Sequence, residues 1–438
     1  MKTSLVLAAV TLAAAACAVH AEGGTSTSEI RELERRIVGP PQPYPADTLT
    51  AEDEARFATS KKARRALGWH VLAKALAPVA VANVPNATIP KFRTWLGGDE
   101  LERMFGKMYA DLGPARRKAK ALPTPEEVNA VFDWASTSLG PSSEQDYFDR
   151  LAQVSGEGAT KIDGLGGNAR VAYSPSYVRQ YLTDYPTIAD CDLDALSFDS
   201  AKTCFSQEFP SDAAVIKTSW RRNDPIVADG LPVVDTSARA LETVDAWSPS
   251  KAPLQKAGPE DAYSVTMSDD AGYSLVGLHI MTKELRHWVW VTVWWSPNDD
   301  DFGADRPEEI TKLGAPWTHY KMSVVTDFEE KDPDPRGGFD GSLGDALAAV
   351  HGPSTWTSNP FLEKGAHNAQ TNCIGCHQHA GDPKVLDAVL DFPEAGRSLV
   401  RQSFPADYSW AFATPPSPDP KDRLQDALKR RIKAYAHE

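Results

Sequence analysis

One short motif in this sequence has the residue types and the spacing to carry chemistry. Residues 371–377 read Thr-Asn-Cys-Ile-Gly-Cys-His, so two thiols are separated by two residues and a histidine follows directly. Thiols at this spacing reach the two vinyl groups of a haem, and the histidine then lies beneath the iron as its proximal ligand. We therefore expect one covalent haem c, bound by Cys373, Cys376 and His377, with His377 as the iron ligand.

The same motif has two other known uses. A thioredoxin-like redox pair would need a strand before the motif and a helix that begins at the first cysteine. A zinc site would need two further ligands, which His367 and His379 could supply. Haem attachment of this kind requires export, and the N-terminus supplies an export signal, so two independent features favour haem.

The sixth ligand of the iron is not given by the motif. Many electron-carrying cytochromes use a methionine well downstream, but no methionine follows Met322. The remaining candidates are Met281, Met322, His279, His287, His319, His351 and His367. We favour His279, because it lies on a strand face beside a Trp-rich hairpin. Two alternatives stay open: a hydrogen-bonded structural histidine, or an iron with no protein ligand on its distal side.

The first 21 residues have the features of a signal peptide. Lys2 gives a positive start, Leu5 to Leu12 form an apolar run, and small residues extend to Ala21. Cleavage after Ala21 would release a periplasmic protein, whereas lipidation of Cys17 would anchor an outer-membrane lipoprotein. The apolar run is too short for a transmembrane helix of about 20 residues, and no later segment is apolar enough.

Net charge and cysteine usage each restrict the class of protein. The formal net charge of −14 argues against nucleic-acid binding, because phosphate backbones need clustered Lys and Arg. Cys191 and Cys204 stand apart from the motif and from the signal region. In an oxidising compartment such a pair is expected to form a disulfide, with two separate thiols as the alternative.

The order of the patterns predicts an α+β protein. Residues 22–49 are expected to be a flexible tether, 50–190 a helical region, 213–328 an antiparallel β domain (a sheet or sandwich), and 346–438 a small haem-binding segment. Helices are expected over 51–76, 98–112, 125–139, 175–185 and 419–436. Thr50 and Asp53 have the spacing of a capping box for the first of these helices.

Alternating residues predict strands over 215–221, 263–268, 274–282, 287–295 and 317–328. The third and fourth strands should form a hairpin through residues 283–286. On the third strand, Gly277, His279 and Met281 share a face, and on the fourth, Trp288, Trp290, Thr292 and Trp294 share a face. So much tryptophan predicts an aromatic layer, packed as ordinary core or against a flat cofactor.

An acidic loop offers a second chemical possibility. Residues 299–305 read Asp-Asp-Asp-Phe-Gly-Ala-Asp, and Ca²⁺ prefers such oxygen clusters. The spacing does not match a full EF-hand loop. A solvated loop partly paired with Arg306 is the favoured interpretation.

Several segments resemble a known group of proteins. They are Val276-Gly277-Leu278-His279-Ile280, Thr282-Lys283, His287-Trp288-Val289-Trp290, Lys217-Thr218-Ser219-Trp220, Ser358-Asn359-Pro360 and Phe404-Pro405-Ala406-Asp407-Tyr408. Together with the single C-terminal motif, they are similar to uncharacterised exported bacterial cytochrome c family (cytochrome c domain-containing) proteins. The resemblance covers roughly residues 215 to 412. It implies haem attachment and the hairpin, and it brings no known reaction.

Three functions are compatible with these features. The first is an exported monohaem cytochrome that passes single electrons to a redox partner, either a protein or a small molecule. The second is a haem enzyme with an open distal site, a peroxidase or oxygenase, in which His279 or His287 with Arg286 would serve in acid–base steps. The third is a haem-based binding or sensing module.

Overall fold

The computed structural model describes twelve stretches of the 438-residue chain: 30–31, 40–81, 85–139, 169–184, 207–223, 230–236, 248–266, 272–300, 302–326, 357–363, 373–377 and 407–409. The signal region with Cys17, the expected disulfide pair Cys191 and Cys204, the expected helix over 419–436 and most of the expected haem-binding segment lie outside these residues.

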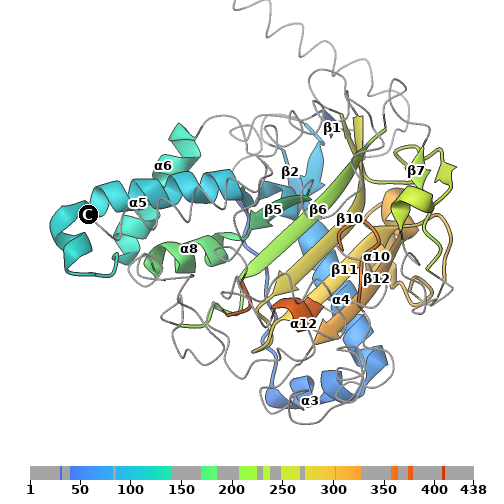
Figure 1. The fold of residues 1–438 in the computed structure, drawn as a ribbon, viewed down its shortest axis with the longest axis horizontal. Helices are drawn as coiled ribbons and strands as arrows, with labels where there is room; N and C mark the ends of the chain where they lie inside the picture. Colours follow the sequence, from blue (N-terminus) through green and yellow to red (C-terminus); the bar gives the residue numbers. More distant parts are fainter. Residues whose placement is uncertain are drawn as a thin grey trace, which may run out of the picture.

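An eight-stranded sheet is the centre of the fold (Figure 1). Its strands are β1 (Ile30–Arg31), β4 (Leu96–Gly97), β5 (Ala169–Tyr173), β6 (Ala214–Arg222), β9 (Ser264–Thr266), β10 (Gly272–Thr282), β11 (Val289–Trp295) and β12 (Tyr320–Thr326). The main path runs β1-β9-β10-β6-β5-β4, and β11 joins β10 to β12. Every pair is antiparallel except β1 with β9.

Helices and two small hairpins complete the described fold. The helices are α3 (Ala51–Thr59), α4 (Lys61–Leu76), α5 (Gly98–Lys118), α6 (Pro125–Ser138), α8 (Pro175–Thr183), α10 (Glu308–Thr311) and α12 (Cys373–His377), with 3-10 turns η1 (Lys91–Thr94), η3 (Pro249–Lys251) and η4 (Ala315–His319). The hairpins pair β2 (Pro78–Ala80) with β3 (Thr88–Pro90) and β7 (Leu231–Pro232) with β8 (Leu254–Gln255). The expected α+β class, with helices and a large antiparallel sheet, is confirmed.

The first expected helix is interrupted. Thr50 and Asp53 form the predicted capping box at the start of α3. The chain then leaves the helix at Ser60, whose side chain accepts a hydrogen bond from the amide of Ala63 and begins α4. Ser60 is therefore a C-cap for one helix and an N-cap for the next, which a continuous apolar periodicity does not reveal.

The region expected to be helical also contributes strands. β5 pairs with β6 along five residues, and β4 pairs with β5 at the sheet edge. Helices α5, α6 and α8 pack on one another and extend to one side of the sheet (Figure 1). Their shared apolar cluster includes Met104, Met108 and Tyr181, so this helical arm is continuous with the core on one sheet face.

Packing also reaches into the segment expected to be a tether. The hydroxyl of Tyr44 donates to Glu284 Oε2 at 2.7 Å, and Tyr44 is 1% exposed. The amide of Gln42 donates to Thr94 Oγ1 at 2.9 Å. Residues 40–49 are thus held against the body of the protein.

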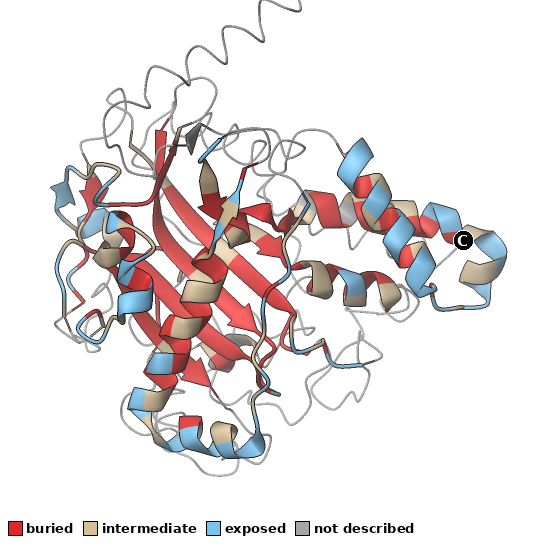
Figure 2. Cartoon of the chain, turned by 180° about the vertical axis from the view of Figure 1, so that it is seen from behind, coloured by how far each residue is buried: buried red, intermediate tan, exposed pale blue. Residues whose placement is uncertain are grey.

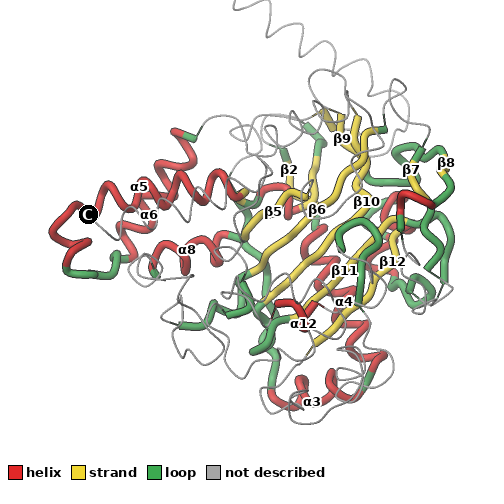
Figure 3. Tube along the Cα trace, in the orientation of Figure 1, coloured by secondary structure: helices red, strands yellow, loops and turns green. Residues whose placement is uncertain are grey.

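The two faces of the sheet have different coverings. On one face α4 crosses the buried strands, which is plain when the molecule is seen from behind (Figure 2). Gly68 of α4 lies so close to Met322 and Val324 that an added Cβ would be 2.9 Å from each side chain. On the other face lie residues 357–363 and the short helix α12, which crosses over β11 (Figure 3).

Within these stretches, no helix combines the length and the apolar character needed to cross a membrane.

Candidate functional site

Helix α12 carries the cysteine–histidine motif. Positions 376 and 377 follow Cys373 by three and four residues, which are the spacings of neighbouring positions on a helix surface. Between them Ile374 is fully buried in the apolar cluster that includes Trp290 and Tyr408. The thiol of Cys373 is partly buried, and its Sγ lies 4.0 Å from the carbonyl oxygen of Thr357. The side chain of Cys376 lies outside the described part.

The ring of His377 is fixed on two sides. Its Nδ1 lies 2.8 Å from the carbonyl oxygen of Tyr408. A carbonyl only accepts hydrogen bonds, so Nδ1 carries the proton and Nε2 is left with a lone pair. The ring also packs against Trp290, with ring centroids 4.5 Å apart and planes tilted by 50°.

The surroundings keep this imidazole neutral. Burial lowers the pKa of His377 from 6.5 to about 4, against the opposing effect of the Tyr408 hydrogen bond. The charges of His279 and Lys217 lower the pKa further, whereas Glu363 raises it. At neutral pH the ring is therefore in the form that binds metals.

These contacts agree with what a metal-ligating histidine needs. Such a residue almost always donates its other ring N–H to a carbonyl or carboxylate, which fixes the tautomer and the ring orientation. His377 has this arrangement, and Cys373 lies one helical turn before it. The residues present fit a haem proximal ligand.

A polar row crosses the same sheet face. In the strand register Lys217 lies opposite His279, His279 opposite Thr292, and Thr292 opposite Ser323. The row next to it is apolar and contains Val215, Met281, Trp290 and Val325. α12 therefore lies where an apolar and a polar part of the face meet.

Residues 357–363 cover the polar row. The buried amide Nδ2 of Asn359 donates to Thr292 Oγ1 at 3.0 Å and to the carbonyl of Val293 at 2.8 Å. This approach requires Gly277, because an added Cβ would lie 3.0 Å from both Asn359 Oδ1 and Phe361 Cβ. The glycine thus allows the segment to lie flat on β10.

His279 lies on the face that carries α12, as the alternation predicted. Its Nε2 is 3.0 Å from Glu363 Oε1, and both side chains are about one-fifth exposed, at 20% and 19%. Burial raises the pKa of Glu363, but the charges of His279 and Lys217 outweigh it and hold that pKa below its ordinary value. Glu363 is therefore a carboxylate at neutral pH, and the distal-ligand role of His279 stays a prediction.

The other ligand candidates lie in different places. Met281 is on the α12 face, directly opposite Trp290. Met322 is on the opposite face beside Gly68, so the sheet separates it from α12. His287 is buried in the hairpin turn, with its ring centroid 5.8 Å from that of Tyr408. His319 ends the 3-10 turn η4. His351, His367 and His379 lie outside the described residues.

The tryptophan layer has three kinds of neighbours. Trp290 packs against His377, Trp294 packs edge-on against Phe302 at 5.1 Å, and Trp288 packs edge-on against Phe209 at 5.7 Å. All three tryptophans are buried. Trp290 contacts the motif helix, whereas Trp288 and Trp294 pack against phenylalanines, so the layer is partly core and partly support for α12.

Several residues of the site were not identified as such from the sequence. They are Lys217, Asn359, Glu363, Tyr408 and its neighbour Asp407, whose carboxylate accepts a hydrogen bond from Lys283. Most of them fall in the segments that carried the resemblance, but no spacing rule connects position 408 with position 377. Their role depends on tertiary contacts alone.

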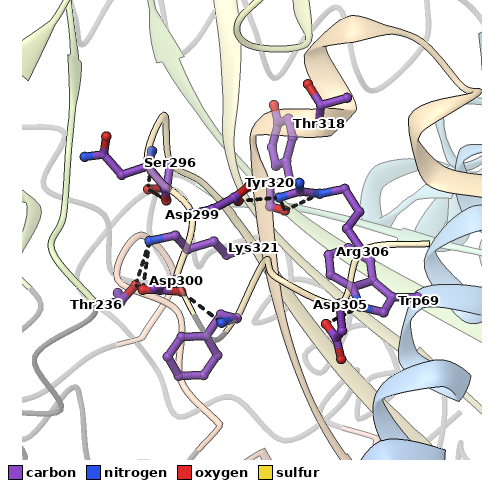
Figure 4. A network of polar contacts seen from close by, with 12 residues as sticks. Trp69, Thr236, Ser296, Asp299, Asp300, Asp305, Arg306, Thr318, Tyr320 and Lys321 are labelled. Atoms are coloured by element: carbon purple, nitrogen blue, oxygen red, sulfur yellow. Dashed lines mark hydrogen bonds and ion pairs between the residues drawn. The ribbon is translucent and has the colours of Figure 1, made fainter. Parts of the chain in front are cut away.

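The acidic loop forms a separate network (Figure 4). Asp299 accepts from Arg306 at 2.9 Å, Asp300 from Lys321 at 2.9 Å, and Asp305 from the indole of Trp69 at 2.9 Å and from Arg65. These carboxylates point to three different cations, and no cluster of three or more metal-binding side chains occurs in the described stretches. The pairing with Arg306 is confirmed, and the arrangement favours an ion-paired loop.

No protein-family model, curated protein or solved structure matches this chain.

Proposed function

We propose that this protein is an exported monohaem c-type cytochrome that acts in one-electron transfer. The observation that carries the proposal is the arrangement of His377, whose Nδ1 is held by Tyr408 and whose Nε2 is left to bind iron, on the same helix as Cys373 and Cys376. The sequence motif and this tautomer support the same cofactor independently.

The residues of the chain have simple roles in this proposal. Cys373 and Cys376 would hold the haem through thioether bonds; each bond would come from addition of a thiol S–H across one vinyl group, with the proton on the other vinyl carbon and no oxidant consumed. The bound haem supplies the one-electron redox chemistry. His377 would bind the iron, with its ring held by Tyr408 and Trp290. Burial in this low-dielectric surrounding is a means of setting the potential.

The signal peptide at the N-terminus supports a location outside the cytoplasm. Export places the folded part in the periplasm or, with Cys17 lipidated, at the outer membrane, where Cys191 and Cys204 would form a disulfide. The partner would be a redox protein or a small molecule. We further propose kinship with the exported cytochrome c family proteins that the sequence resembles.

One observation favours a second function, a haem enzyme with an open distal site. His279 and Glu363 form a histidine–carboxylate pair, and both side chains are close enough to His377 for their charges to shift its pKa. Such a pair is suited to acid–base steps. This alternative requires an iron that is open to exogenous ligands.

Two measurements test these proposals. Mass spectrometry of the full-length exported protein should show one added haem that survives acid–acetone extraction, and Cys373→Ala with Cys376→Ala should abolish it. Absence of covalent haem in the wild type would sink the proposal. The absorption spectrum then separates the two functions: a low-spin haem that ignores carbon monoxide supports electron transfer, and a high-spin haem that binds it quickly supports the enzyme.

A further inference from the structure

The carbonyl that holds His377 belongs to an unusual turn. Asp407 and Tyr408 both have positive φ, 42° and 65°. Neither is glycine, and a residue with a side chain adopts this left-handed region only at an energetic cost. Such a turn persists only where its surroundings hold it in place.

The carboxylate of Asp407 supplies that hold. Its Oδ1 accepts from Lys283 Nζ at 2.8 Å and from the indole N–H of Trp288 at 3.2 Å. Its Oδ2 accepts from the amide of Phe209 at 2.9 Å. The three donors come from the β10–β11 turn, from the residue before β11 and from the segment before β6. Asp407 itself is buried.

The donor Lys283 is itself fixed. Its side chain is 4% exposed, and Nζ also donates to the carbonyl of Arg286 at 2.5 Å and lies 3.1 Å from Glu208 Oε2. Its ammonium lies 5.5 Å from the ring centre of Trp288. A buried cation that is held in this way gives a strong, charge-assisted anchor for the carboxylate.

A second anchor lies on the other side of Tyr408. The hydroxyls of Ser409 and of Tyr177 in α8 are 2.5 Å apart. Tyr408 therefore lies between two residues with side-chain hydrogen bonds, and its carbonyl oxygen is 2.8 Å from Nδ1 of His377.

We propose that Asp407 is the positioning residue for His377, acting through the backbone carbonyl of Tyr408. The inference rests on the proposed haem attachment, and it adds that the hairpin turn at Lys283 controls the orientation and basicity of the iron ligand. A strong hydrogen bond from Nδ1 makes an imidazole a better donor to iron, so loosening the turn would raise the reduction potential.

The test uses Asp407→Asn in the full-length, haem-loaded protein. The amide places an NH₂ group where a carboxylate oxygen had accepted, so at least one of the three donors to Asp407 loses its acceptor. We expect a more positive midpoint potential. We also expect the His377 ring N–H to exchange with solvent about tenfold faster. A change of this size corresponds to the loss of one hydrogen bond to the charged carboxylate of Asp407.

Glu208→Gln is the matched control. It removes the other carboxylate beside Lys283 but touches neither Asp407 nor Tyr408 in the described structure. We expect its potential and its ring N–H exchange to equal those of the wild type. If Asp407→Asn does not fold, Trp288→Phe removes a single donor to Asp407 and should shift both quantities in the same direction by less.

The outcomes separate the two proposals. A folded, haem-loaded Asp407→Asn (or Trp288→Phe) protein with wild-type potential and wild-type exchange overturns the positioning role. If the wild type carries no covalent haem, the proposed function fails by itself. The nitrogen chemical shifts of His377 in the full-length chain then still test the inference. The Nδ1–H tautomer of His377 should dominate in the wild type and be lost in Asp407→Asn. An unchanged tautomer in that variant contradicts the positioning role of Asp407.

Discussion

The indole of Trp290 and the imidazole of His377 lie with their ring centroids 4.5 Å apart. Trp290 is also tied to the hairpin turn, because its Nε1 donates to the carbonyl of His287 at 2.9 Å. Strand β11 therefore supports the proposed iron ligand directly. One face of the sheet acts as the platform for the site, while the other is occupied by α4.

This platform gives a first prediction. Trp290→Phe loses the hydrogen bond to His287 and part of the contact with His377, so the free energy of unfolding should fall by about 1–2 kcal/mol. The haem absorption spectrum should shift as well, because the ligand ring gains freedom. Trp317→Phe is the control: Trp317 stacks on Tyr263 at 4.9 Å in the other apolar cluster, so stability should fall without a spectral shift. Equal spectra for both variants would contradict a supporting role for Trp290.

A second prediction concerns the close approach at Gly277. Gly277→Ala places a Cβ 3.0 Å from Asn359 Oδ1 and from Phe361 Cβ, both on a packed segment. The overpacking should cost about 1–3 kcal/mol in urea unfolding. Gly106→Ala in α5 is the matched control, because its Cβ would meet nothing within 4 Å. That substitution should stabilise by about 1 kcal/mol through helix propensity. A neutral Gly277→Ala would show that residues 357–363 do not need the glycine.

The longer strands of the main sheet could be predicted because each is a run of seven to eleven residues rich in side chains that favour strands. The expected β6, β10, β11 and β12 agree with the structure within a few residues, as does the hairpin between β10 and β11. β4 and β5 could not be predicted, since a strand of two residues and one of five carry too little periodicity to compete with the helices around them.

The site divides in the same way. The motif at Cys373, and the shared face of Gly277, His279 and Met281, follow from local spacing. Glu363, Asp407 and Tyr408 do not, because each reaches the site through a loop whose path depends on the finished sheet. Tyr408 is 31 positions from its partner His377, and Asp407 is 124 positions from its partner Lys283. No local pattern encodes such contacts.

A third prediction concerns the buried carboxylate that ties residues 40–49 to the sheet. Glu284 has a fully buried side chain that accepts from the Tyr44 hydroxyl at 2.7 Å, the Asp47 amide at 2.7 Å and Lys74 Nζ at 2.6 Å. Glu284→Gln leaves the buried Lys74 with one carboxylate fewer and should cost about 3 kcal/mol. The segment should also become sensitive to protease.

The control for Glu284→Gln is an exposed ion pair that also joins a glutamate to a lysine. Glu308 and Lys312 lie 3.1 Å apart with exposed side chains. Glu308→Gln should leave both the urea midpoint and the protease pattern unchanged, since surface pairs contribute little. If Glu284→Gln behaves like Glu308→Gln, the buried carboxylate does not hold the segment.

The last prediction uses the pKa of His377 in the haem-free, full-length chain, made with Cys373→Ala and Cys376→Ala. Burial lowers the folded pKa to about 4 from 6.5. Between these two values the unfolded chain binds a proton that the folded chain does not, so stability rises with pH there. The contribution of His377 to the free energy of unfolding is complete above pH 6.5, the pKa in the unfolded chain, and is lost as the pH falls toward the folded-state pKa of about 4. The loss should reach roughly 3 kcal/mol at most, because one pKa unit is worth about 1.4 kcal/mol. Adding His377→Gln to this chain should flatten that part of the urea-midpoint profile against pH. An equally steep profile in both chains would show that His377 is not buried as a neutral ring.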